Sequence, residues 1–180
     1  MPLPMRARLL FLPALAAAAM PAPARAVDYL TVAQARALIF PGAKFTDAAF
    51  EMSDGEVVKV GEVSLDASVW RRKVPAWKAS TGGLFFLDQC LGRGDIITFA
   101  LGLDASGAVK GLEILVCVGT YDQVRKPEWT ARFVGCRRDG KDPADVVPNI
   151  SGTTQSAQHL IGSVRKLLLI HQIMKTRKLV

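Results

Sequence analysis

A hydroxyl-rich segment ahead of an amphipathic run is the part of this chain whose residue types could do chemistry. It reads Asn149-Ile150-Ser151-Gly152-Thr153-Thr154-Gln155-Ser156. Gly152 can adopt a positive φ or let the backbone approach a ligand closely. The helix predicted to follow presents unpaired N–H groups and the positive end of its dipole, which suits a phosphate. Serine and threonine are also favoured helix caps without any ligand, so these residues alone leave both interpretations open.

The same segment resembles the flavin-attachment motif Ser/Thr-Gly-Ala-Thr of the FMN-binding domain family, which is usually followed by x-Ser/Thr-Ser and an amphipathic helix. Ser151, Gly152 and Thr154 match this motif, and Thr153 stands where the family usually has Ala. The family includes a component of the sodium-pumping NADH:quinone oxidoreductase, a component of the Rnf complex and short exported single-domain proteins. Further stretches resemble the short exported members in the same order: Val27–Thr31, Phe40-Pro41-Gly42, Gly83 to Val118, Pro127-Glu128-Trp129 through Phe133-Val134-Gly135, and Ile150 to Leu168.

The resemblance implies that FMN is the cofactor and that a separate flavin transferase attaches its phosphate to Thr154 as a phosphoester. The residues it assigns to the cofactor are Ser151, Gly152, Thr153, Thr154, Ser156 and Trp129. Trp129 could stack on the flavin ring or belong to the core, which is the commoner place for aromatic residues. No metal ligands and no catalytic residues are expected.

The function that this resemblance implies is electron transfer in the periplasm between redox partner proteins, membrane-bound ones included. We therefore expect an electron carrier rather than a stand-alone enzyme, because a bound flavin supplies the redox chemistry and the protein supplies its placement. A flavin-dependent reductase is a further alternative. Another is an exported binding or structural domain of the same fold that holds FMN non-covalently or has lost it. Thr153 and the absence of an acidic residue at 146–149 favour this last alternative.

Other types of chemistry lack their residue patterns. The chain has no nucleophile elbow and no phosphate-binding P-loop. Its two histidines, His159 and His171, are twelve residues apart with no repeated carboxylate beside them, so packing or surface roles are expected. The three cysteines are expected to be small buried residues, although one disulfide in any of three pairings is also open; they are Cys90, Cys117 and Cys136.

The elements that must position the site are predicted from periodicity. Apolar residues recur at helical spacing over 156–175, which predicts a long amphipathic helix. Residues 84–91, 95–103 and 109–118 read as three strands of an antiparallel meander, with Leu112, Ile114, Val116 and Val118 on one face. The fold class is therefore α+β, with the meander packed against this helix.

Weaker signals predict the remaining elements. Thr31 and Gln34 form a capping box for a helix that ends at Pro41-Gly42. Ser53 and Glu56 repeat that signature, although the valines that follow count against a helix. Residues 74–77 are a candidate strand within the ambiguous stretch 63–82, and residues 139–148 are rich in turn formers. Arg93-Gly94-Asp95 is interpreted as a hairpin turn rather than an adhesion tripeptide.

The N-terminus has the layout of an export signal. Arg6 and Arg8 precede an apolar run over 9–20, and Ala24-Arg25-Ala26 offers small residues at the positions that a signal peptidase reads. We expect cleavage before Val27, which leaves residues 27–180 as a single exported FMN-binding domain. The run is shorter than the roughly 20 apolar residues of a membrane span. Residues 1–26 contain three arginines and no acidic residue, so their removal lowers the net charge from +7 to +4. The remaining basic residues form no stripe that would suggest nucleic acid as a partner.

Overall fold

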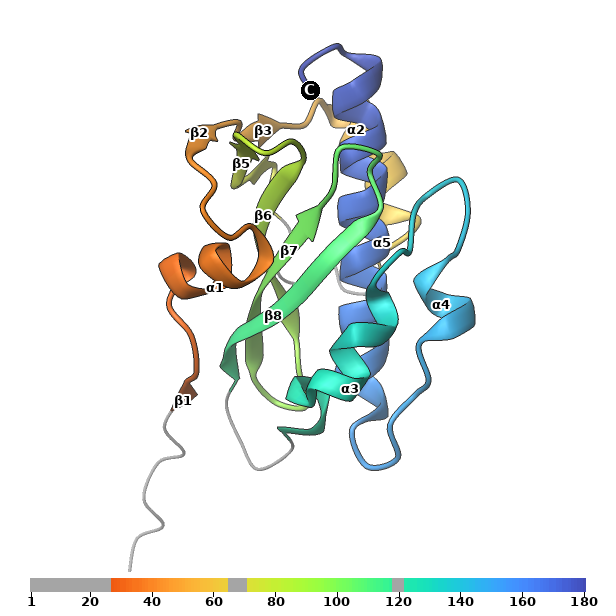
Figure 1. Ribbon diagram of the computed structural model, residues 1–180. Coiled ribbons are helices and arrows are strands. Elements are labelled where there is room, and N and C mark those ends of the chain that lie inside the picture. The colour runs from red at the N-terminus through yellow and green to blue at the C-terminus, as the bar shows by residue number, and fades with distance from the viewer. Residues whose placement is uncertain (1–26, 65–70, 118–121) are drawn as a thin grey trace, which may run out of the picture.

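The computed structural model describes residues 27–64, 71–117 and 122–180, and these form an α+β fold as predicted (Figure 1). One antiparallel sheet has six strands in the order β1-β8-β7-β6-β5-β2, and β3 pairs with β4 separately. The strands are β1 (Val27–Asp28), β2 (Phe45–Asp47), β3 (Phe50–Glu51), β4 (Lys73–Val74), β5 (Ala76–Ala79), β6 (Leu84–Leu91), β7 (Ile96–Leu103) and β8 (Val109–Cys117). The helices are α1 (Val32–Ile39), α2 (Asp54–Gly61), α3 (Pro127–Thr130), α4 (Pro143–Val146) and α5 (Thr154–Thr176), with 3₁₀ turns η1 (Asp122–Arg125) and η2 (Ala131–Phe133).

The predicted meander is confirmed in β6, β7 and β8, which pair antiparallel in sequence order. Tight turns join them, at residues 92–95 and 104–108. In the second turn, one carboxylate oxygen of Asp104 accepts from the backbone N–H groups of Ser106 and Ala108 at 2.8 and 3.1 Å. These hydrogen bonds stabilise the turn, which explains why β7 ends at the polar residues 104–107, where the sequence indicated.

The face assignment of β8 needs a correction at Val116. The register moves from Thr98↔Val116 to Phe99↔Ile114, so Leu115 is an extra residue in the strand and forms a β-bulge. Leu112 and Ile114 contribute to the core around α5, whereas Val116 packs in the cluster on the opposite face. The prediction that Val116 shares their face was therefore wrong, because a bulge reverses the alternation; Val118 lies outside the described residues.

Helix α5 packs across one face of the sheet, as predicted from its apolar stripe (Figure 1). The predicted stripe residues Ala157, Leu160, Ile161, Val164, Leu167 and Leu168 are all buried, and His171 lies half-buried at its edge. Lys166 extends from the same helix into this interface and forms an ion pair with Asp88 of β6 at 2.6 Å. Both of these side chains are only 7% exposed, so helix and strand are joined by a buried charge pair as well as by apolar contact.

Helix α1 covers part of the opposite face and forms a second, smaller cluster (Figure 1). Its predicted capping box is present: Gln34 N–H donates to Thr31 Oγ1, and Thr31 N–H donates to Gln34 Oε1. The guanidinium of Arg36 lies over the rings of Trp77 and Phe45, 4.2 and 4.8 Å from their centroids. Cation–π contact thus helps to hold α1 on the sheet.

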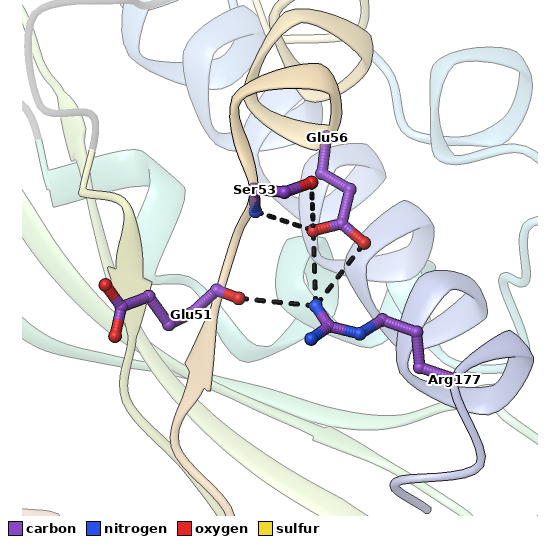
Figure 2. A network of polar contacts seen from close by, with 4 residues as sticks. All are labelled: Glu51, Ser53, Glu56 and Arg177. Atoms are coloured by element: carbon purple, nitrogen blue, oxygen red, sulfur yellow. Dashed lines mark hydrogen bonds and ion pairs between the residues drawn. The ribbon is translucent and has the colours of Figure 1, made fainter.

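Polar contacts connect the C-terminal end of α5 to α2 (Figure 2). The Glu56 carboxylate accepts from the Ser53 N–H at 2.7 Å, which forms the second predicted capping box despite the valines. Arg177, which follows α5, donates to both carboxylate oxygens of Glu56 and to the backbone oxygen of Glu51. Its guanidinium also lies 5.2 Å from the centroid of the Phe50 ring.

Two further regions differ in detail from the predictions, whereas the cysteines agree with theirs. Pro75, which lacks an N–H, separates the candidate strand 74–77 into β4 and β5, which belong to different sheets. The turn-rich stretch 139–148 contains the short helix α4, whose first turn Asp142 caps through the Ala144 N–H. All three cysteines are buried, as the interpretation as small core residues predicted.

Candidate functional site

The hydroxyl-rich segment forms a short loop that leads into α5, and Thr153 is the residue that precedes the helix. Its N–H donates to Ile150 O at 3.1 Å, and its own carbonyl accepts the first helical bond, from Ala157 N–H. The Thr153 side chain makes no capping bond. It is 1% exposed, and its Oγ1 has no hydrogen-bond partner among the described residues. A buried hydroxyl without a partner is costly, which marks this position as unusual.

Thr154 is the first residue of α5, and its side chain is exposed. Its hydroxyl donates to Ile150 O at 3.1 Å, which orients the side chain and leaves the lone pairs of Oγ1 available. Ser151 and Gly152 before it are exposed as well. Gly152 has φ +83°, and a Cβ there would meet nothing within 4 Å. Glycine is therefore favoured by the backbone conformation of the loop and not by crowding.

Ser156 has a different surrounding from the other hydroxyl residues. It is 4% exposed, and its Oγ accepts a hydrogen bond of 3.0 Å from the N–H of Arg93, in the turn between β6 and β7. Three residues further along the helix, His159 Nδ1 donates to Leu91 O at 2.8 Å, since a carbonyl can only accept. These two bonds hold the β6–β7 turn against the first turns of α5.

Arg93 is the residue near the site that the sequence analysis missed. Its Nη1 donates to Gly152 O at 3.3 Å, across 59 positions of sequence. The sequence showed Arg93 only as part of a hairpin turn, and nothing in its neighbourhood signalled that this turn would reach the hydroxyl-rich segment. Only the docking of the meander on α5 brings them together.

Trp129 is placed in the core, one of the two locations that the sequence left open. It is 6% exposed and packs edge-on against Phe133, with ring centroids 5.2 Å apart. Its indole N–H donates to Pro148 O at 2.9 Å. Trp129 therefore anchors the chain just before the hydroxyl-rich segment, while Ser151, Gly152, Thr153 and Thr154 form the segment itself.

The electrostatic character of the site favours an anion. The first turn of α5 contains no acidic residue, so nothing within the helix complements the positive end of its dipole. The nearby guanidinium of Arg93 adds further positive charge. Together with the exposed Thr154 hydroxyl, these features would suit an anion such as a phosphate group.

Other kinds of site receive no such support from the described residues. Within them there is no group of three or more His, Cys, Asp or Glu side chains that could hold a metal ion. His159 binds the Leu91 carbonyl beside the β6–β7 turn. His171 packs against Gly107, and a Cβ added at that glycine would come within 2.4 Å of the His171 ring. None of the helices in residues 27–64, 71–117 and 122–180 is long and apolar enough to cross a membrane.

Comparison with known proteins adds no assignment to this geometry. No protein-family model matches the chain, and neither the curated proteins nor the solved structures yield a significant match.

Proposed function

We propose that this protein is an exported flavoprotein that carries FMN on Thr154, through a phosphoester bond, and transfers electrons between partner proteins in the periplasm. The observation that carries the proposal is the exposed Thr154 hydroxyl at the start of a 23-residue helix whose N-cap side chain makes no capping bond. An uncapped helix N-terminus offers N–H groups to a phosphate, and the hydroxyl offers an attachment point. The resemblance of residues 151–156 to the flavin-attachment motif supplies the identity of the ligand.

Each residue of the segment then has a distinct role. Thr154 Oγ1 would be the nucleophile: it would attack the phosphorus next to the flavin of a flavin dinucleotide donor and lose its proton. The bond from that phosphorus to the bridging oxygen would break, and a nucleoside monophosphate would leave with the electron pair of that bond. Gly152 lets the loop turn, and Trp129 anchors it through Pro148 O. When bound, FMN supplies one- and two-electron redox chemistry, and the protein supplies its attachment and orientation.

The proposal is tested by co-expression with a flavin transferase, followed by intact mass and a visible spectrum after denaturation. The wild type should gain the mass of FMN less one water, and the flavin should stay with the chain in denaturant. Thr154→Val keeps the shape of the side chain, removes the oxygen and should lose the added mass. Thr153→Val is the matched control and should keep it, because the covalent bond does not pass through that residue.

Two other outcomes select the alternatives. A wild type that binds free FMN without added mass would indicate non-covalent binding, and Thr154→Val would then weaken it by about 1–2 kcal/mol, the worth of one hydrogen bond. A wild type that neither gains mass nor binds FMN would overturn the flavin assignment and leave a binding or structural domain. Reduction of an acceptor without partner proteins would identify a reductase instead of an electron carrier.

A further inference from the structure

A cavity of about 280 Å³ lies near the C-terminal end of α5, between that helix, the β5–β6 turn and the β7–β8 turn. In Figure 1 this end of α5 is marked by the C-terminus of the chain. His171, which lines the cavity, is 17 positions after Thr154 in the same helix. At a rise of about 1.5 Å per residue, the two are roughly 25 Å apart. The cavity is therefore a separate site, and nothing about it depends on flavin attachment.

Most of the cavity wall is apolar. Leu84 of β6 and Ala105 of the β7–β8 turn line it, together with Gly82 and Gly83 of the β5–β6 turn. Gly83 has φ +95°, and a Cβ there would collide with Leu103 O, so glycine lets the β5–β6 turn approach β7 closely. An apolar cavity with a few polar groups at its edge is typical of a small-molecule site, and this volume is at the lower end of the usual range.

Two ammonium groups border the apolar space. Lys78 of β5 lies directly opposite Leu84, so it is on the face of the sheet that α5 covers. Lys175 belongs to the last turn of α5. Neither ammonium group has an ion-pair or hydrogen-bond partner in residues 27–64, 71–117 and 122–180. The helix dipole alone favours a cation at Lys175, whereas Lys78 has no such explanation.

An imidazole lies between these groups and the β7–β8 turn. His171 is half-buried, packs against Gly107 and precedes Lys175 by one helical turn. Among the described residues, neither of its ring nitrogens has a hydrogen-bond partner. Burial, followed by the charge of Lys175, lowers the pKa of His171, whereas Asp104 and Asp139 oppose this effect. A half-buried polar ring without a partner gains most from a ligand that bonds to it.

One carboxylate also lines the cavity, but the β7–β8 turn uses it. Asp104 Oδ1 accepts from the N–H and the hydroxyl of Ser106 at 2.8 and 2.7 Å and from the N–H of Ala108 at 3.1 Å. Its single charge stands against two ammonium groups. The cavity edge therefore offers hydrogen-bond donors that suit an anionic acceptor.

We propose that this cavity binds a small organic anion, namely a monocarboxylate with a short apolar chain. Its carboxylate accepts from the ammonium groups of Lys78 and Lys175 and from the ring of His171. Its chain covers Leu84 and Ala105. An inorganic anion such as phosphate would leave these apolar walls in contact with water, so the carboxylate class fits the cavity better.

The test measures the binding of butyrate, butylamine and inorganic phosphate by calorimetry and by NMR. Butyrate should bind most tightly, because butylamine has the same chain with the opposite charge and phosphate lacks the chain. Lys78→Gln and Lys175→Gln should each weaken butyrate about three- to tenfold, since charges near the surface are screened. Lys175→Arg should retain most of the affinity because the charge stays. Lys59→Gln, at an exposed lysine of α2, is the matched control and should have no effect.

The ring of His171 supplies a second readout by NMR titration. A bound carboxylate stabilises the protonated ring, so butyrate should raise the pKa of His171. By linkage, the affinity for butyrate should increase as the pH falls from about 8 to about 5.5. Other charged groups also face this ring, so the titration is followed on the ring itself, with and without butyrate; these groups are Lys78, Asp104, Arg138, Asp139 and Lys175.

Three results would overturn the proposal: no binding of butyrate by the wild type, binding of butylamine or phosphate at least as tight as that of butyrate, or unchanged affinity in both lysine variants. Val180 also borders the cavity, so a chain extended by two glycines after it is compared with the wild type. Butyrate binding by the extended chain alone would show that the Val180 carboxylate occupies the cavity, which would also overturn the proposal. Melting temperatures without ligand should agree between wild type and variants, which excludes loss of fold as the cause.

Discussion

At the scale of single residues, two neighbouring hydroxyls of the site have opposite surroundings. Thr154 is exposed and donates only to the nearby Ile150 carbonyl, so it is open to reaction. Ser156, two positions later, is buried and accepts from a different part of the chain. A motif of similar hydroxyls in the sequence thus divides into a candidate attachment point and a structural contact, according to which side of α5 each residue faces.

The contact between Ser156 and Arg93 predicts a measurable stability effect. Ser156→Ala removes the acceptor of the Arg93 N–H and leaves that part-buried donor without this bond. Such a loss should lower the free energy of unfolding by about 1–3 kcal/mol in urea melts. Ser151→Ala alters an exposed hydroxyl and should change stability by less than about 0.5 kcal/mol. Equal effects of the two substitutions would contradict the role assigned to Ser156.

At the scale of elements, α5 is the helix on which both the site and the core depend. Its inner face packs on β6, and its N-terminus carries Thr154. Leu160 and Leu168 are 0% and 1% exposed on that inner face. Leu160→Ala and Leu168→Ala should each cost about 2–5 kcal/mol in denaturant melts, because a cavity remains where the side chain was. Leu38→Ala is the control, since Leu38 is 59% exposed, and it should be nearly neutral.

The contacts between Arg177, at the C-terminal end of α5, and Glu56 of α2 predict that stability depends on pH (Figure 2). The Ser53 N–H donates to the Glu56 carboxylate and, with Arg177, holds the pKa of Glu56 below its ordinary value. Because the pKa of Glu56 is lower in the folded state, its ionised carboxylate stabilises the fold, and this stabilisation is complete above the unfolded pKa, about 4.3. It is then lost as the pH falls through the folded pKa.

Acid melts of Glu56→Gln measure this contribution. The variant should be less stable than the wild type at neutral pH, and the difference should shrink as the pH falls below about 4. Glu51→Gln is a suitable control, because Arg177 contacts Glu51 only through its backbone oxygen. A stability difference that stays constant across the acid range would show that Glu56 acts through packing and not through its charge.

At the scale of the whole molecule, the described residues begin with the edge strand β1, directly after the expected cleavage position. β1 pairs Val27 with Cys117 and Asp28 with Val116 at the edge of the sheet. Cleavage before Val27 would therefore leave this pairing intact. We expect N-terminal sequencing of protein from the periplasm to begin at Val27, because Ala24 and Ala26 occupy the positions that a signal peptidase reads.

The matched variant for this prediction is Ala26→Arg, which should block processing and retain a longer chain at the membrane. A protein that starts at Met1 or Met5 and remains membrane-bound in the wild type would contradict both the cleavage and the location. Electron transfer between periplasmic partners would then need revision, since it depends on export.

The sequence by itself determined the elements whose signals are local. The capping residues Thr31 and Gln34 start α1, the Asp104 turn ends β7, and apolar spacing over 156–175 defines the buried face of α5. These signals can be read because hydrogen bonds near the main chain and helical periodicity depend on residues only a few positions apart. The candidate attachment residue, Thr154, was instead chosen because residues 151–156 resemble the flavin-attachment motif; its neighbourhood alone left a helix cap and a phosphate site both open.

Only the tertiary structure decided the relations between distant segments. The bulge at Leu115 moved Val116 to the other face, the core took in Trp129, and the β6–β7 turn brought Arg93 to Gly152. Each outcome depends on how the sheet and α5 pack, and no local preference encodes it. A hairpin turn of the same residues could face solvent in another fold; here it lies against a helix N-terminus because the meander and α5 bury their apolar faces against each other.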